Sequence, residues 1–157
     1  MDFFARIEQS GLAQWVSASI EGYPIMITLH SVGLAVVAGL AVAIDLRVLG
    51  YFRSIPFSSL RTFFTIAWLG FLVNFLSGAA LFTSQATTYV RDGTFLLKMA
   101  FVLVGAATMG YLQPAIARVG DGPGADSVVP GGARNAAILS LAVWAGAVIT
   151  GRLIAYL

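Results

Sequence analysis

The sequence has no cysteine, a single histidine and few charged residues, and each scarcity excludes a class of protein. Without cysteine the chain cannot form a disulfide, an iron–sulfur cluster or a zinc–thiolate site. Charged residues make up 10 % of the 157 residues, against about 25 % in soluble domains. Lysine and arginine together number nine and form no basic run, so the composition excludes a nucleic-acid-binding protein.

Apolar residues are abundant instead, at 59 % of the chain, which is more than a soluble domain of this length could bury. A helix that spans a bilayer needs about 20 mostly apolar residues. Four stretches meet that length, at about 23–44, 62–82, 94–117 and 135–157. Backbone groups in hydrocarbon must be satisfied within the segment. We therefore predict an all-α integral membrane protein whose residues 23–157 form a four-helix transmembrane bundle.

Residues 1–22 show a different pattern, in which apolar and charged residues separate onto two faces. The apolar stripe at helical spacing consists of Phe4, Ile7, Leu12, Trp15 and Val16. A helix with this pattern lies in the membrane interface rather than across the membrane. The sequence therefore predicts an N-terminal amphipathic interfacial helix.

Arginines in the predicted loops indicate the orientation. The loops after the first and third predicted spans carry Arg47, Arg53, Arg61, Arg118 and Arg134. The opposite side carries Arg6 and Arg91 outside the spans. Cytoplasmic loops are enriched in arginine and lysine. We therefore expect a multi-pass protein of the bacterial inner (cytoplasmic) membrane with both termini in the periplasm.

Each predicted span carries a polar side chain near its outer end. His30 lies about 10 Å inside the first span, Lys98 about 6 Å inside the third and Arg152 about 8 Å inside the fourth, at 1.5 Å per residue. Asn74 and Ser77 lie at similar depths in the second. Ionisable residues inside a membrane are costly and indicate a functional site. We therefore predict that these five residues bind a cofactor or substrate in the outer leaflet.

Structural roles are the alternatives for the same residues. Lys98 and Arg152 could extend to the membrane surface, and His30 could be a neutral histidine bonded to a neighbouring helix. Asn74 and Ser77 could hold helices together through hydrogen bonds. Against this, no acidic residue lies within a predicted span except Asp45 at the cytoplasmic end. The two cations therefore suit an external anion: a haem propionate, a lipid phosphate or a carboxylate substrate.

A b-type haem would use these residues together. Neutral imidazole is a common axial ligand of haem iron, which makes His30 the candidate iron ligand. Met99 or Met109 could supply a second ligand, and five-coordinate iron or a histidine of a second protomer are the alternatives. Small and aromatic residues expected around a haem slot are Gly33, Gly78, Gly105, Trp68, Phe71, Phe75, Phe95 and Phe101.

Three stretches resemble HemJ-type protoporphyrinogen oxidases and CopD-like membrane proteins. They are YPIMITLHSVGLAVVAGLAVAIDLRVLG from residue 23, LSGAALF from residue 76 and GTFLLKMAFVLV from residue 93. The resemblance covers roughly residues 23–117 and is closest to a branch of unknown function. It implies that His30 is a haem-associated histidine and that Lys98 is the functional, candidate catalytic lysine. The second histidine-bearing motifs of the oxidases are absent, so haem binding is the property carried over.

Two functions from different classes follow. The first is a haem b protein with a redox or electron-transfer role, an oxidoreductase or a subunit of one, with a quinone or a cytochrome as partner. The alternative is a non-catalytic membrane anchor or assembly subunit of a larger membrane complex. Small residues at Ala35, Gly39 and Ala43 and at Ala142, Gly146 and Thr150 favour close helix packing within a bundle or a homo-oligomer in the lipid bilayer.

Overall fold

The computed structural model describes residues 2–119 and 129–154, and these residues form helices without a strand. Four helices are long and apolar enough to cross a membrane: α3 (Gly22–Val48), α4 (Leu60–Ser84), α6 (Gly93–Ala117) and α7 (Gly131–Leu153). The all-α four-helix membrane bundle is confirmed. The last helix begins four residues before the predicted span, and the predicted stretch 155–157 lies outside the described residues.

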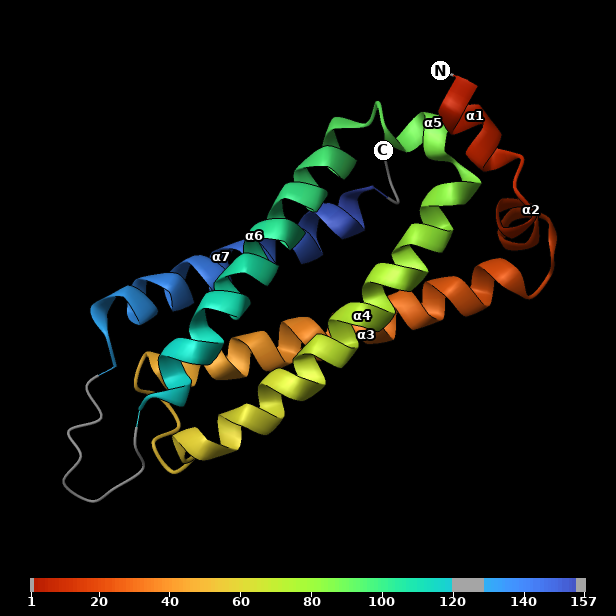
Figure 1. Ribbon diagram of the computed structural model, residues 1–157. Coiled ribbons are helices and arrows are strands. Elements are labelled where there is room, and N and C mark those ends of the chain that lie inside the picture. The colour runs from red at the N-terminus through yellow and green to blue at the C-terminus, as the bar shows by residue number, and fades with distance from the viewer. Residues whose placement is uncertain (1, 120–128, 155–157) are drawn as a thin grey trace.

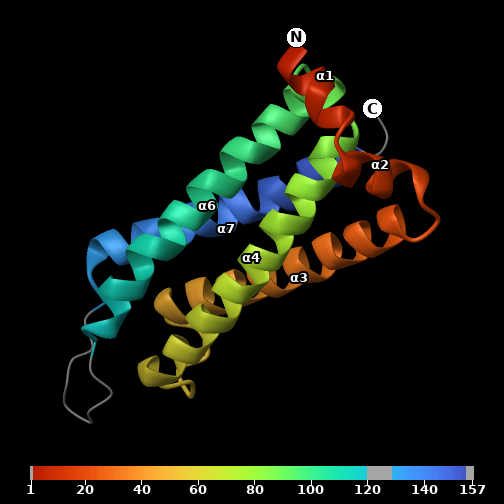
Figure 2. The ribbon, with the colours of Figure 1, turned by 45° about the vertical axis from the view of Figure 1, so that its right-hand side comes forward.

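The long helices form two antiparallel pairs, α3 with α4 and α6 with α7 (Figure 1). Contacts between α3 and α7 join the pairs, whereas α4 and α6 touch at few points. Turning the molecule shows the same arrangement, with α1, α2 and α5 gathered at one end (Figure 2). The α3–α4 connection lies at the opposite end. A cavity lined by residues of both α4 and α6 lies between the pairs.

Small residues set the closest approach between α3 and α4. A Cβ atom on Gly33 would lie 2.6 Å from the backbone nitrogen of Asn74 and 2.9 Å from the carbonyl oxygen of Gly70. A Cβ on Gly70 would lie 2.7 Å from Cγ1 of Val36. Because membrane helices associate through close packing, glycines at the contact let the two backbones approach. This contact fixes α4 against α3 one turn from His30.

The apolar core fills the half of the bundle next to the α3–α4 connection. Its largest fully buried side chains include Trp144, Phe64, Ile44, Leu60 and Met109. Large apolar side chains also cover the outside, and Leu69, Leu103 and Ile149 are each more than half exposed. Such a surface fits contact with a lipid bilayer. The other half of the bundle carries the polar residues described below.

Asp45 of α3 is a buried acid within this core, only 1 % exposed. Neither carboxyl oxygen has a hydrogen-bond partner among the described residues. Ser140 of α7, also 1 % exposed, is the polar side chain nearest to act on the carboxyl group. A buried polar group without a partner destabilises the fold. Asp45 therefore costs stability where it stands.

Asp45→Asn is accordingly expected to leave the free energy of unfolding unchanged or to raise it by about 1 kcal/mol, because it keeps the shape and removes the ionisable group. Thermal unfolding in detergent measures the change. Ser140→Ala, which deletes the neighbouring hydroxyl, is the companion variant. A fall of more than about 1 kcal/mol for Asp45→Asn would show that the carboxyl group makes a stabilising interaction.

The N-terminal segment forms two helices, α1 (Asp2–Glu8) and α2 (Gly11–Ala18), where one interfacial helix was predicted. The break occurs at Ser10, whose hydroxyl accepts a hydrogen bond from the backbone N–H of Ala13 and so caps α2. α1 packs against the short helix α5 (Ala86–Tyr89), and α2 packs against α4 and α3. The apolar stripe is therefore used in part to cover the end of the bundle, where Val16 is fully buried.

Candidate functional site

His30 of α3 and Asn74 of α4 form a reciprocal hydrogen-bonded pair. The side-chain amide of Asn74 donates to the carbonyl oxygen of His30 at 2.8 Å. In return, Nδ1 of His30 lies 2.9 Å from the backbone carbonyl oxygen of Asn74. Ser77, whose hydroxyl donates to the carbonyl of Val73, lies beside the ring with its oxygen 3.5 Å from Nδ1. The close α3–α4 packing makes these contacts possible.

These contacts assign the proton of the His30 ring. A backbone carbonyl can only accept, so Nδ1 carries the proton and donates it to Asn74. The other nitrogen, Nε2, then has a free lone pair. Nζ of Lys98 on α6 lies 3.3 Å from Nε2 and donates to it. His30 thus connects α4 to α6 through its two ring nitrogens.

Lys98 lies half-buried beside the C-terminal end of α7. Its Cε would be 3.4 Å from a Cβ on Gly151, so the glycine leaves space for the lysine chain. Among the described residues its amino group has no acidic partner, and His30 is its hydrogen-bond partner. His30, Asn74 and Lys98 thus meet through hydrogen bonds at one level of the bundle.

Gly78 provides the space for the imidazole. A Cβ at this position would lie 2.9 Å from Cε1 and 3.1 Å from Nδ1 of His30. A larger residue would push the ring away from its present position, because the ring is held on its other side by Asn74. Gly78 is therefore part of the site around His30.

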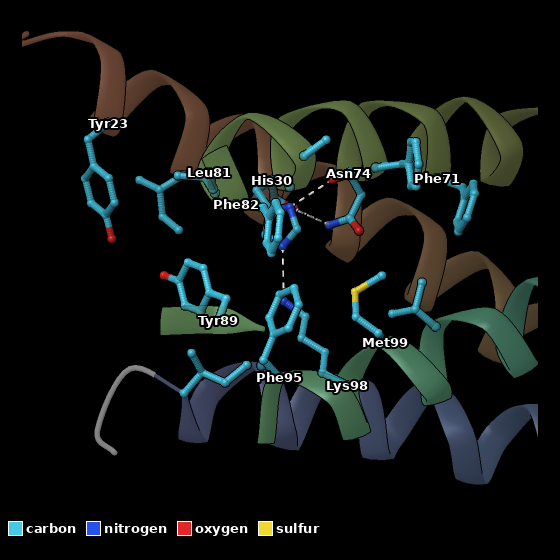
Figure 3. A pocket seen from close by; sticks show the side chains of 17 residues that line it. Tyr23, His30, Phe71, Asn74, Leu81, Phe82, Tyr89, Phe95, Lys98 and Met99 are labelled. Atoms are coloured by element: carbon cyan, nitrogen blue, oxygen red, sulfur yellow. Dashed lines mark hydrogen bonds between the residues drawn. The ribbon is translucent and has the colours of Figure 1, made fainter. Parts of the chain in front are cut away.

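A cavity of about 470 Å³ opens beside His30 and Lys98, a size typical of small-molecule sites. It lies between the two helix pairs, with aromatic rings on its walls (Figure 3). Phe82, Tyr89 and Phe95 form a stacked cluster with ring centroids 5.2–6.4 Å apart. Phe71 and Phe75, which also line the cavity, stack on each other with ring centroids 6.2 Å apart. The cavity is thus apolar, with a polar region made by His30, Asn74 and Lys98.

The remaining predicted site residues separate into those at the cavity and those elsewhere. Met99 lines the cavity beside Lys98. Met109 is 2 % exposed and belongs to the closed apolar core, away from the cavity lining. Arg152 is exposed on α7 and is absent from the lining, although its neighbour Gly151 is present. The structure therefore brings Met99 to the site and leaves Met109 and Arg152 outside it.

Four of the predicted slot residues have other roles. Gly33 lies at the α3–α4 contact, and Gly105 packs beneath the ring of Trp144. Trp68 of α4 donates from Nε1 to the side-chain oxygen of Gln113 at 2.9 Å and so bridges α4 to α6. Phe101 packs against the core. None of these four lines the cavity.

Sequence reasoning missed Tyr23, Tyr89 and Phe82. Tyr23 and Tyr89 extend from α3 and α5 toward the same end of the cavity, where Figure 3 shows both hydroxyls. Burial raises the pKa of Tyr89, and the nearby Tyr23 and Asp92 raise it further. Tyrosine is typical of membrane–water interfaces, which is the sequence signal that could have placed these two residues at the ends of their helices.

The N-terminal helices are connected to the aromatic wall. The Phe4 ring on α1 meets Phe82 edge-on at 6.4 Å. Oε1 of Glu8 accepts hydrogen bonds from the backbone N–H of Thr87 at 2.9 Å and from its hydroxyl at 2.7 Å. The two bonds from Thr87 hold the pKa of Glu8 below its ordinary value. Together these contacts hold α1 on α5.

We expect the docking of α1 on α5 to depend on pH through Glu8. A carboxyl group with a lowered pKa in the folded state stabilises the contact above the unfolded pKa of 4.5. That stabilisation is lost as the pH falls below 4.5 and through the lower folded pKa. Amide hydrogen exchange of α1 in detergent, compared between wild type and Glu8→Gln at each pH, measures it. Equal pH profiles for the two proteins would contradict the assignment.

Among the described residues, no three His, Cys, Asp or Glu side chains come together. His30 therefore offers a single imidazole rather than a set of ligands for a bare metal ion. Comparison of the chain with family models, curated proteins and solved structures found no match. The resemblance to the HemJ-type and CopD-like proteins accordingly stays a prediction from the sequence.

Proposed function

We propose that this membrane protein binds b-type haem in the cavity between its helix pairs and serves in electron transfer. One observation carries the proposal: Nδ1 of His30 is fixed on the backbone carbonyl of Asn74, while the ring lines a largely apolar cavity and its Nε2 faces Lys98. Metal-ligating histidines are held in this manner, with the second nitrogen donating to a carbonyl or carboxylate. His30 is therefore the proposed axial ligand.

The other residues around the cavity fit a haem in chemistry. Stacked phenylalanines and the small residues Gly78, Ala79 and Gly151 provide flat apolar walls. Met99 is the proposed second ligand because its thioether lines the same cavity. Lys98 occupies the position next to Nε2, so binding requires its flexible chain to move aside. The moved amino group would then be available to a propionate.

When bound, the haem would supply a centre that takes up and releases one electron. The residues of the chain would set its properties. The hydrogen bond from Nδ1 to Asn74 would keep the ring in one tautomer and raise the basicity of Nε2. Lys98 would bind the anionic edge of the group, and the aromatic cluster would keep the site apolar. A quinone or a cytochrome is the proposed electron partner.

The proposed orientation follows the loop arginines. With the α3–α4 and α6–α7 connections in the cytoplasm, the site lies in the outer half of a bacterial inner membrane. Both termini are then periplasmic. The end with α1, α2 and α5 would face the periplasm, and the cavity would lie directly beneath it.

Titration of the purified, detergent-solubilised protein with hemin tests the proposal. We expect a saturable absorbance change at one haem per chain. The control is Ser31→Ala, one residue from His30, whose hydroxyl bonds only within its own helix to the carbonyl of Ile27. Absorbance that rises without saturation, as for hemin partitioning into empty detergent micelles, would overturn the proposal and favour the non-catalytic anchor.

A further inference from the structure

A second cavity, of about 200 Å³, lies between α4 and α6 at the end opposite to the haem site. Its apolar walls come from Phe57, Phe64 and Ile116. Phe57 is held in place by Arg47, whose guanidinium carbon lies 3.9 Å from the ring centroid. The Nε of Arg47 also donates to the carbonyl of Ile55 at 2.6 Å. The wall of the cavity is thus fixed by neighbours outside it.

Among the described residues, the polar lining of this cavity consists of Arg61, Thr65 and Gln113, with no acidic side chain. Arg61 is exposed and has no hydrogen-bond partner for its guanidinium among the described residues. Gln113 accepts from Trp68 through its side-chain oxygen, so its amide N–H groups remain available. An arginine with a neighbouring amide donor is suited to a phosphate group.

The position of the cavity indicates whether the phosphate group belongs to a lipid or to a free anion. It opens between two helices that face lipid, and α4 continues from it with the exposed side chains Ile66 and Leu69. Arg53 and Arg134 lie at the same end of the bundle and add to the positive charge there. Basic pockets between transmembrane helices bind lipid headgroups. A phospholipid satisfies both the donors and the apolar wall, whereas free phosphate satisfies only the donors.

We infer that the groove between the Arg61 end of α4 and the Gln113 end of α6 binds an anionic phospholipid. The phosphate is held by Arg61 and by the amide of Gln113. An acyl chain lies against Phe64 and Ile116 and continues into the bilayer. The site is separate from the haem cavity, because the bridge from Trp68 to Gln113 crosses between α4 and α6.

Native mass spectrometry of protein released from micelles that contain equal amounts of phosphatidylglycerol and phosphatidylcholine tests the inference. We expect one phosphatidylglycerol to be retained preferentially. Arg61→Ala should lower its retention by about tenfold, the loss typical of one charge-assisted contact. Arg61→Lys should keep part of the preference. Arg134→Ala removes an exposed arginine from the same end outside the cavity lining and should retain the lipid as wild type does.

Two results would overturn the inference. Equal retention by Arg61→Ala and Arg134→Ala would mean that Arg61 only extends to the membrane surface. Displacement of the lipid by millimolar inorganic phosphate would mean that the site takes the free anion. The melting temperatures of the two variants are the control. If they are equal, a loss of lipid from Arg61→Ala reflects the binding site and not unfolding. Neither result depends on haem binding, so the two proposals can fail separately.

Discussion

His30→Ala is expected to weaken hemin binding by about 100-fold or more, since even partners in the second shell of a metal ligand contribute 10–100-fold to affinity. The substitution removes the only imidazole of the chain, so no imidazole nitrogen lines the cavity in this variant. Gly78 then faces an empty space where the ring stood. Hemin titration followed at the Soret band measures the loss.

Added imidazole separates the loss of a ligand from the loss of the fold. In His30→Ala the vacated space is next to Gly78 and Asn74 and opens to the cavity. We expect millimolar imidazole to restore part of the hemin affinity to this variant and to leave Ser31→Ala unchanged. Hemin binding by His30→Ala that equals the Ser31→Ala control would show that another group holds the ligand.

Gly33→Ala is expected to lower the free energy of unfolding by about 1–3 kcal/mol, the range for overpacking a tight contact. The added methyl group would lie 2.6 Å from the backbone nitrogen of Asn74. Backbone atoms cannot rotate away as a side chain can, so α3 and α4 must separate. The reciprocal bonds between His30 and Asn74 cross this same contact and would lengthen.

Gly39→Ala is the matched control, because it lies on the same helix with nothing within 4 Å of its Cβ position. Alanine in place of an unconstrained helical glycine stabilises by about 0.5–1 kcal/mol. Thermal unfolding of both variants in one detergent measures the difference between them. A Gly33→Ala protein as stable as Gly39→Ala would contradict the close approach of α3 and α4.

The four spans could be predicted because a bilayer imposes a minimum length on an apolar helix. Asp92 caps α6, because its carboxylate accepts from the backbone N–H of Thr94 at 2.8 Å, and an aspartate directly before an apolar run is a sequence signal for the start of a helix. The division of the N-terminal segment was not predicted. Its stripe fits one continuous helix, and only Ser10 before Gly11 marks the break. Packing on α4 and α5 depends on tertiary contacts that periodicity does not reveal.

The site was predictable in depth but not in rotation about the helix axes. Counting residues from the span ends placed His30, Asn74 and Lys98 at one level, and they do meet. The same count placed Arg152 there, yet successive residues on a helix point about 100° apart. Gly151 therefore faces Lys98 and Arg152 does not line the cavity. Met109 lies about 16 Å along α6 from Lys98, at 1.5 Å per residue, and reaches the core instead.

The absorption spectrum of the wild-type protein, purified in detergent from haem-replete cells, tests most directly whether His30 and Lys98 define a haem site. We predict a Soret band that shifts on reduction with dithionite and is absent from His30→Ala purified in parallel. A wild-type spectrum without a Soret band, from protein that elutes as a single folded species, would contradict the account.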